Sequence, residues 1–234
     1  MKYLLPSKFL LFVIISGAVH LSNCQESLET ALYERYGSTG AHINLFGNCP
    51  DLSALGFDNR SNSSCVSGFW LFYAEPNYCY GGVRFGYSPY GTTKYCFDFT
   101  ANAASISSAR SVASVEGLSQ DSLTLYEDVC FIGEELRITN SLSALTSLVG
   151  QHESLIITGT SSWTLCEGEN YTRPKICLQA IANTPLIISN LRNLGIHPGS
   201  IRSIRKGCTA KESLPTEKIE VLASSSACSP SGIK

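Results

Sequence analysis

Short stretches in which apolar and polar residues alternate dominate the chain, and helical spacing is rare. Leu123-Thr124-Leu125-Tyr126-Glu127 places leucines at alternate positions, the period of a strand with one buried face. Residues 41–46 and 134–139 are similar strand-like pieces next to glycine-bounded turns, whereas residues 28–36 also fit a short helix. The pattern predicts an all-β protein, a sandwich of Greek keys.

One unit occurs twice, 93 residues apart, and this relation favours a strand over 28–36 because that stretch corresponds to the alternating one at 123–127. A fainter spacing of 40 residues divides each unit in two. We therefore expect two domains, each of two Greek keys, at 28–112 and 123–208. A small, polar linker would occupy 113–122 and a mobile tail 209–234. The matching pairs at the longer offset are Trp70–Tyr78 with Trp163–Tyr171, Tyr33-Glu34 with Tyr126-Glu127, and Gly40 with Gly133.

The first residues have the pattern of a secretory signal. A lysine at position 2 precedes the apolar run 9–15, and Ser16 and Ala18 have the small side chains that a signal peptidase prefers. The signal would span 1–18, or 1–24 if cleavage follows Cys24. No later run is long enough to cross a bilayer, so we expect a secreted extracellular protein without a membrane anchor.

Charge adds little to this picture. The net charge is −2, the isoelectric point is near 6.1, and only 15% of residues are charged. Nucleic-acid binding would need a basic patch, so we expect no nucleic-acid partner. Extracellular proteins or glycans are the partners to be expected.

Ten cysteines in a secreted chain indicate disulfides rather than metal ligands. Each domain contains four, an even number, and their pairing within a domain has three possible connectivities. They do not superpose at the 93-residue offset, so either the domains are cross-linked differently or some bridges join them. Cys228 would pair with Cys24 if processing retains that residue. The candidates are Cys49, Cys65, Cys79 and Cys96 in the first domain, and Cys130, Cys166, Cys177 and Cys208 in the second.

The repeats resemble the βγ-crystallin superfamily, whose Greek keys carry aromatic-Glu-x-x-x-aromatic-x-Gly. The stretch from Tyr126 to Gly133 matches every defined position. The copy at 166–173 has Cys166 for the first aromatic and Arg173 for the glycine, the copy at 33–40 has Ser38 for the second aromatic, and the copy at 73–80 loses Glu to Ala74 and Gly to Tyr80. Residues 108–112 and 200–204 resemble the closing strands. The resemblance covers roughly 28–207.

The resemblance implies structural roles for the motif residues. The glycines would allow a positive φ where a hairpin folds over its sheet, and the tryptophans would fill the core. Cys166 would compensate for the missing aromatic by forming a disulfide. The fold-defining residues predicted in this way are Tyr33, Glu34, Gly40, Trp70, Tyr73, Tyr78, Tyr126, Glu127, Phe131, Gly133, Trp163, Glu167 and Tyr171.

Many microbial and invertebrate members of the family bind calcium through an Asn/Asp-Asn/Asp-x-x-Ser/Thr-Ser stretch. The segment from Asp58 to Ser63 fits, with Asn62 in place of Ser or Thr, so the candidate ligands are Asp58, Asn59, Asn62 and Ser63. The other three loops lack the acids, having Ala103-Ala104, Gly150 or Gly195-Ile196 instead. An ordinary turn rich in Asn, Asp and Ser explains the segment better.

Three Asn-x-Ser/Thr sequons, at Asn59, Asn62 and Asn170, are candidates for glycosylation, and a glycan on Asn59 would compete with calcium. His42, His152 and His197 follow the signal, and none belongs to a local catalytic or zinc motif. The sequence therefore predicts a non-enzymatic extracellular structural or binding protein without a required cofactor. The alternatives are a secreted effector, such as a toxin, antimicrobial or protease inhibitor, that binds a partner through its loops, and a calcium-binding protein.

Overall fold

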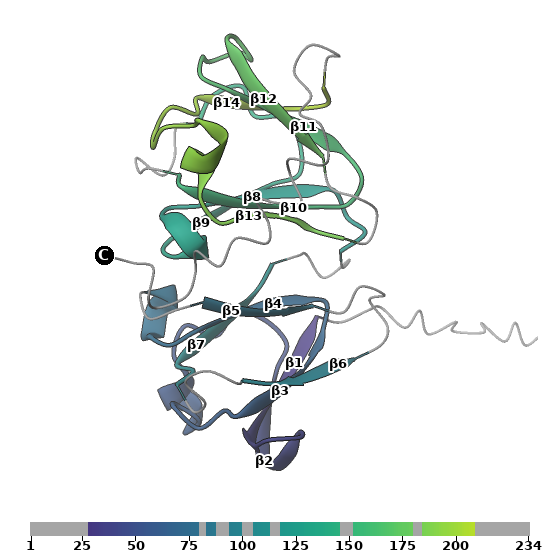
Figure 1. The fold of residues 1–234 in the computed structure, drawn as a ribbon, viewed down its shortest axis with the longest axis vertical. Coiled ribbons are helices and arrows are strands. Elements are labelled where there is room, and N and C mark those ends of the chain that lie inside the picture. The colour runs from purple at the N-terminus through teal and green to yellow at the C-terminus, as the bar shows by residue number, and fades with distance from the viewer. Residues whose placement is uncertain are drawn as a thin grey trace, which may run out of the picture.

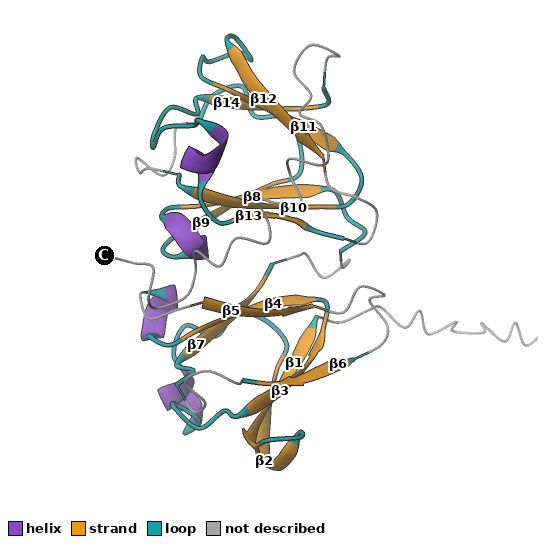
Figure 2. Cartoon of the chain, in the orientation of Figure 1, coloured by secondary structure: helices purple, strands orange, loops and turns teal. Residues whose placement is uncertain are grey.

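The computed structural model describes residues 28–79, 83–87, 94–99, 105–112, 118–145, 152–179 and 184–208. Over these residues the regular structure is antiparallel β-sheet with four short 3-10 helices, and it forms two stacked domains (Figures 1 and 2). The all-β prediction is confirmed, including the strand preferred over a helix at 28–36. The predicted signal and tail lie outside the described residues. No described helix has the length and apolar character needed to cross a membrane.

The first domain packs a four-stranded sheet, ordered β2-β1-β3-β6, against a three-stranded sheet, ordered β5-β4-β7. Two 3-10 helices lie between strands. The elements are β1 (Glu29–Arg35), β2 (Thr39–Leu45), η1 (Leu52–Leu55), β3 (Ser63–Ser67), β4 (Phe69–Tyr73), η2 (Pro76–Tyr78), β5 (Val83–Tyr87), β6 (Tyr95–Asp98) and β7 (Ser108–Ser111).

The second domain repeats this arrangement with sheets ordered β13-β10-β8-β9 and β12-β11-β14. Its elements are β8 (Ser122–Tyr126), η3 (Val129–Phe131), β9 (Glu135–Ile138), β10 (Ser154–Thr158), β11 (Ser162–Cys166), β12 (Pro174–Gln179), β13 (Leu186–Ile188), η4 (Leu191–Leu194) and β14 (Ser203–Lys206). Of the segment predicted as a linker, the described residues 118–121 contact this domain, since the backbone carbonyl of Leu118 accepts a hydrogen bond from the amide of Gly159.

Exchange of one strand between neighbouring keys identifies the Greek keys. In the first domain β6 pairs with β3 of the preceding key, and Cys49 forms an isolated bridge with Ala109 of β7. In the second domain β13 pairs with β10, and Leu142 bridges Ile204 of β14. Each sheet therefore contains backbone from both keys of its domain, as predicted for two Greek keys per domain.

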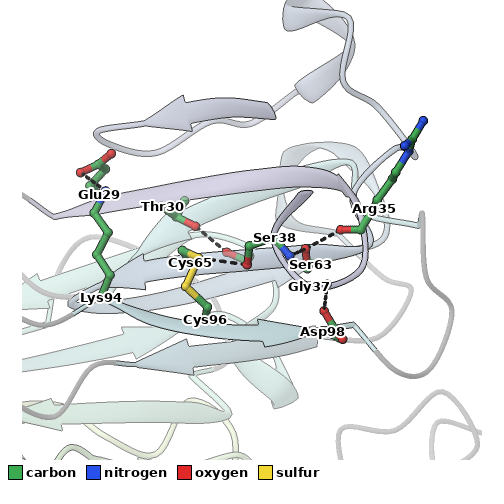
Figure 3. Close-up of a disulfide and its surroundings, with 11 residues drawn as sticks. Glu29, Thr30, Arg35, Gly37, Ser38, Ser63, Cys65, Lys94, Cys96 and Asp98 are labelled. Atoms are coloured by element: carbon green, nitrogen blue, oxygen red, sulfur yellow. Dashed lines mark hydrogen bonds and ion pairs between the residues drawn. A yellow bond between two sulfur atoms is a disulfide. The ribbon is translucent and has the colours of Figure 1, made fainter. Parts of the chain in front are cut away.

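A serine fixes the folded hairpin in every key. Ser63 Oγ donates to the carbonyl of Arg35 at 2.6 Å and accepts from the amide of Ser38 at 3.0 Å (Figure 3). Ser108, Ser154 and Ser203 make the same pair of bonds in the other three keys. The last strand of the first domain, β7, therefore corresponds to the last strand of the second, β14, with Ser108 matching Ser203. The predicted match of 108–112 with 200–204 placed Ser108 against Ser200 and is corrected by three residues.

The hairpin glycines adopt the predicted left-handed conformation. Gly40 and Gly133 have φ of +84° and +80°, and a Cβ on Gly133 would lie 2.6 Å from Glu127 Oε2. Arg173 occupies the same place in the last key with φ of +49° despite its side chain. Glu127 accepts a hydrogen bond from the amide of Glu134, so its structural role is also as predicted.

Two hydrophobic clusters make up the interior, and Trp70 and Trp163 lie fully buried in one each. The cluster around Trp70 continues into the second domain, where it includes Tyr126, Phe131 and Ile156. The domains therefore share apolar packing in addition to their separate cores.

The disulfides are fewer among the described residues than predicted. Cys65 and Cys96 lie directly opposite each other on β3 and β6 and are bonded (Figure 3), as are Cys177 and Cys208. Cys130 also belongs to a disulfide, and its partner lies outside the described residues. The predicted Cys24–Cys228 pair concerns the two cysteines outside the described residues, and a bond from either of them to Cys130 would exclude it.

Three disulfide predictions are wrong, because Cys49, Cys79 and Cys166 are thiols. The sulfurs of Cys49 and Cys79 each donate to a carbonyl of their own loop. Cys166 lies in a central strand opposite Pro174 and Ser203, so no cysteine faces it from either neighbouring strand. The buried side chain of Cys166 itself occupies the place of the missing aromatic.

Candidate functional site

The four predicted calcium ligands lie in the loop that leads into β3. Asp58 Oδ2 accepts a hydrogen bond from Asn59 Nδ2 at 2.8 Å, and Asp58 Oδ1 is buried without a hydrogen-bond partner in the described structure. Asn62 Nδ2 donates to the carbonyl of Glu34 at 2.5 Å. Ser63 makes the two hairpin bonds that recur in all four keys. Two of the four predicted ligands are thus used to hold the hairpin.

The neighbourhood of this loop does not favour a divalent cation. Calcium takes six to eight oxygen ligands, and the described residues contain no group of three or more His, Cys, Asp or Glu side chains that could hold a metal ion. The guanidinium of Arg60 lies 3.0 Å from Glu34 Oε1, and its hydrogen bond lowers the pKa of Glu34. Asp58 retains one unused oxygen, and calcium binding at this loop stays a prediction. Ala103-Ala104 and Gly150, which stand where two of the other loops lack the acids, lie outside the described residues.

The three sequons differ in how open their asparagines are. Asn59 and Asn170 are exposed, and both have a left-handed backbone at a turn. Asn62 is half-buried and its amide nitrogen is occupied by the Glu34 carbonyl. The amide nitrogen of Asn59 also donates, to Asp58, so exposure is what distinguishes Asn59 and Asn170 from Asn62, and glycosylation at all three stays a prediction.

The histidines stand apart from one another and from the thiols. His42 stacks on Tyr33 at the surface, with ring centroids 5.1 Å apart. His152 is 4% exposed, and burial lowers its pKa. Within the described part of the chain, no histidine lies in a cluster with thiol or acidic side chains.

The most elaborate polar site lies between the two domains, at Arg110 of β7, which is 1% exposed. Its Nε donates to the hydroxyl of Tyr73 at 2.8 Å. Its Nη2 donates to the carbonyls of Phe131 and Gly133 in the second domain, at 2.7 and 3.0 Å. Its Nη1 lies 3.6 Å from a carboxylate oxygen of Glu135. One side chain of the first domain thereby binds η3 and β9 of the second.

Aromatic rings enclose this guanidinium. Its central carbon lies 5.1, 4.4 and 5.0 Å from the ring centroids of Tyr73, Tyr78 and Tyr126. Burial acts to lower the pKa of Arg110, but the neighbouring tyrosines and Glu135 outweigh that effect and the pKa is raised. Arg110 is therefore a permanent cation, stabilised by both domains.

Two further bonds continue the joint on either side of Arg110. The hydroxyl of Tyr73 donates to the carbonyl of Phe131 at 2.8 Å, so this acceptor is shared between Tyr73 and Arg110. The amide of Gly133 donates to the carbonyl of Tyr78 at 3.2 Å, which connects the hairpins of the second and third keys. We call this set of contacts the interdomain joint. These contacts bind one domain to the other.

The sequence contains one signal for this joint. All five residues of β4, Phe69-Trp70-Leu71-Phe72-Tyr73, are apolar and fully buried. A strand with one solvated face alternates, and a continuous apolar run indicates burial on both faces. Here the first domain's own core covers one face and the second domain covers the other. Arg110 carried no comparable signal, because its partners are backbone carbonyls about 20 residues further along the chain.

Comparison with known proteins identifies the fold. The family model described as Beta/Gamma crystallin matches residues 29–112. Geodin, a beta-gamma crystallin from Geodia cydonium, superposes with a TM-score of 0.59 at 22% identity, over 77% of this chain and 99% of its own. A beta gamma crystallin from Ciona intestinalis gives a TM-score of 0.31 at 21% identity, over 36% of this chain and 98% of its own.

Protein S, in a solution structure complexed with calcium, gives a TM-score of 0.27 at 17% identity, over 77% of this chain and 99% of its own. A search of curated proteins finds no significant sequence match. The family match covers the first domain, and the second domain repeats its strand order and hairpins. Residues 29–112 therefore form a βγ-crystallin domain, and the chain has the βγ-crystallin fold.

Proposed function

We propose that this protein is a secreted, non-enzymatic component of the extracellular space, in which it acts as a durable structural or binding element. The observation that carries the proposal is the interdomain joint, which ties two βγ-crystallin domains together through the buried Arg110. A joint of this kind does not turn over a substrate. It keeps two surfaces at a fixed relative position, which suits assembly or binding.

The disulfides and the N-terminal sequence support secretion. Cross-links such as Cys65–Cys96 and Cys177–Cys208 persist in oxidising compartments. Each closes a loop of 31 residues, and such loops constrain the unfolded chain by about 3–4 kcal/mol in the chain-entropy account. Resistance to unfolding is the property that a long-lived extracellular protein needs.

The test of this function is to find where the protein accumulates. Antibody staining and quantitative mass spectrometry of the producing tissue should find it abundant and constant in matrix or fluid, with both disulfides oxidised. Restriction to glands, or induction only on challenge, would favour the effector alternative and overturn the structural role. Retention inside the cell with reduced cysteines would overturn secretion.

A second candidate function, calcium binding, is supported by the unpartnered Asp58 Oδ1 alone. Calorimetric titration with calcium of the oxidised, secreted protein, with Asp58→Asn as a control, decides between the two. Heat of binding that Asp58→Asn abolishes would establish a calcium role. An unchanged melting temperature with calcium or with EDTA would dismiss it.

A further inference from the structure

Cys130, in η3 of the second domain, forms a disulfide whose partner is not among the described residues. The other cysteines of the chain narrow that partner to two positions. Of the ten cysteines, four are paired with each other and three are thiols, which leaves Cys24, Cys130 and Cys228. Cys130 is therefore joined to one of the two cysteines that precede and follow the described part of the chain.

The hairpin of the third key does not itself require a cysteine at position 130. The residue at this point of each key has a left-handed backbone, with φ between +51° and +66°. Glycine and asparagine adopt this conformation most readily, whereas cysteine adopts it at a cost. Position 130 thus carries a side chain that its backbone disfavours, and the bond is what this side chain supplies. The equivalent residues of the other keys are Gly37, Asn77 and Asn170.

The N-terminal candidate is short of chain. Cys24 lies four residues before Leu28, so their Cα atoms are at most about 14 Å apart. Leu28 packs against Gly68, which directly precedes β4, whereas the residue after Cys130 accepts a hydrogen bond from Tyr73 at the far end of β4. These two ends are about 17 Å apart along the strand. Cys24 therefore reaches η3 only if a fully extended chain runs straight along β4.

The C-terminal candidate meets no such limit. Cys228 follows Cys208, the last described residue, by 20 positions, which span up to about 66 Å when extended. This length exceeds the diameter of a domain of this size, about 35 Å. Cys228 is also retained wherever the predicted signal is cut, whereas cleavage after Cys24 removes that cysteine.

We propose that Cys130 and Cys228 form a disulfide that anchors the C-terminal tail to η3, beside the interdomain joint. The two thiols lose two protons and two electrons, and a disulfide carried by an oxidising enzyme of the secretory pathway accepts them as it becomes a dithiol. Bridged cysteines have Cα atoms within about 7 Å of each other, so residue 228 lies against η3. The next residue, Phe131, accepts hydrogen bonds from Tyr73 and Arg110. The tail is thereby fastened where the two domains meet, and this pairing replaces the predicted bond between Cys24 and Cys228.

Peptide mapping of the unreduced, secreted protein tests the pairing. After free thiols have been blocked under denaturing conditions, trypsin places the three cysteines in separate peptides, which are 111–137, 219–234 and the N-terminal peptide that ends at Arg35. We expect 111–137 to be recovered linked to 219–234, and the link to disappear on reduction. Recovery of 111–137 linked to the N-terminal peptide, or with a blocked thiol, would overturn the proposal.

Cys228→Ser tests the anchor without altering any described contact of the joint. Peptide 111–137 should then carry a blocked thiol, and the melting temperature should fall by about 5 °C or more, because the unfolded chain is no longer closed into a loop of about 100 residues. The matched control is Cys79→Ser, which removes an exposed thiol and should change neither the link nor the melting temperature. A 111–137 peptide that stays linked in Cys228→Ser would place the bond elsewhere, and a melting temperature equal to that of Cys79→Ser would show that the tail is not held to the folded protein.

Discussion

Arg110→Ala should separate the two domains energetically. The substitution removes the hydrogen bonds to Tyr73, Phe131 and Gly133, the ion pair with Glu135, and the packing of three tyrosine rings. It leaves two backbone carbonyls and a carboxylate without their cation. Removing one member of a buried charged network costs about 3–5 kcal/mol. Since each kcal/mol lowers the melting temperature of a chain of this size by about 2–4 °C, we expect a decrease of roughly 10 °C.

Differential scanning calorimetry is the appropriate assay, because it also reports whether the domains unfold together. The unmodified protein should show one transition, since the joint couples its domains. Arg110→Ala should show two transitions, with the less stable domain unfolding first. Arg110→Lys should resemble Arg110→Ala more than the unmodified protein, because an ammonium cannot reach both carbonyls and the tyrosine hydroxyl from one position.

The matched control is Arg60→Ala. Arg60 also pairs with a glutamate, Glu34, at 3.0 Å, but both side chains are about half exposed, and surface pairs contribute little to stability. Its removal should leave a single transition with a much smaller change in melting temperature. A single, unshifted transition for both Arg110→Ala and the apolar, unbranched Arg110→Met would refute the assignment of coupling to Arg110.

Three further predictions concern pH and backbone conformation. The Ser161 hydroxyl, with backbone amides and Lys206, holds the pKa of Asp121 well below its usual range. The stability from this carboxylate is therefore present above its unfolded pKa of about 3.9 and lost as the pH falls below it. Asp121→Asn should be destabilised by about 1–3 kcal/mol at pH 7 in urea titrations, and a deficit that does not shrink between pH 7 and pH 2 would contradict this. Burial raises the pKa of Tyr78 to about 12, so its folded state holds the proton more tightly than the unfolded chain and stability should fall from about pH 10 to 12; a loss of stability over this range that is just as large in Tyr78→Phe would argue against it. Arg173→Gly should raise the free energy of unfolding by about 1 kcal/mol, because glycine adopts the left-handed conformation without strain. Gly133→Ala should lower it, and a change of the same sign in both would refute the conformational explanation.

The sequence predicted those features of the fold that are local and repeated. Tyr126-Glu127 with Gly133 requires only that a hairpin fold back over its own sheet, and the contact of Glu127 with the Glu134 amide shows that it does. Trp70 and Trp163 followed from the 93-residue offset in the same way. Such features depend on neighbours within one key, so a single sequence contains the information.

The cysteine pairing and the joint could not be predicted in this way. Whether a cysteine has a partner depends on the register of strands far apart in the chain, and Cys166 lies opposite Pro174 and Ser203 only because β11 is a central strand. Arg110 binds carbonyls that carry no side-chain signature. Ser63 was predicted to be a calcium ligand because the sequence does not show that a serine at this position holds the hairpin of every key.

The first aromatic of the motif shows how one repeated position acquires different roles. Tyr33 of the first key stacks on His42 at the surface, where no other domain covers it. Tyr73 and Tyr126, from the second and third keys, are fully buried against Arg110 because their sheets face each other across the joint. The same residue type in the same hairpin is thus half-exposed in one key and part of the joint in two others. The role of each aromatic is decided by whether another sheet packs against the hairpin that contains it. Positions that depart from the motif therefore have to be judged by this packing as well as by the motif.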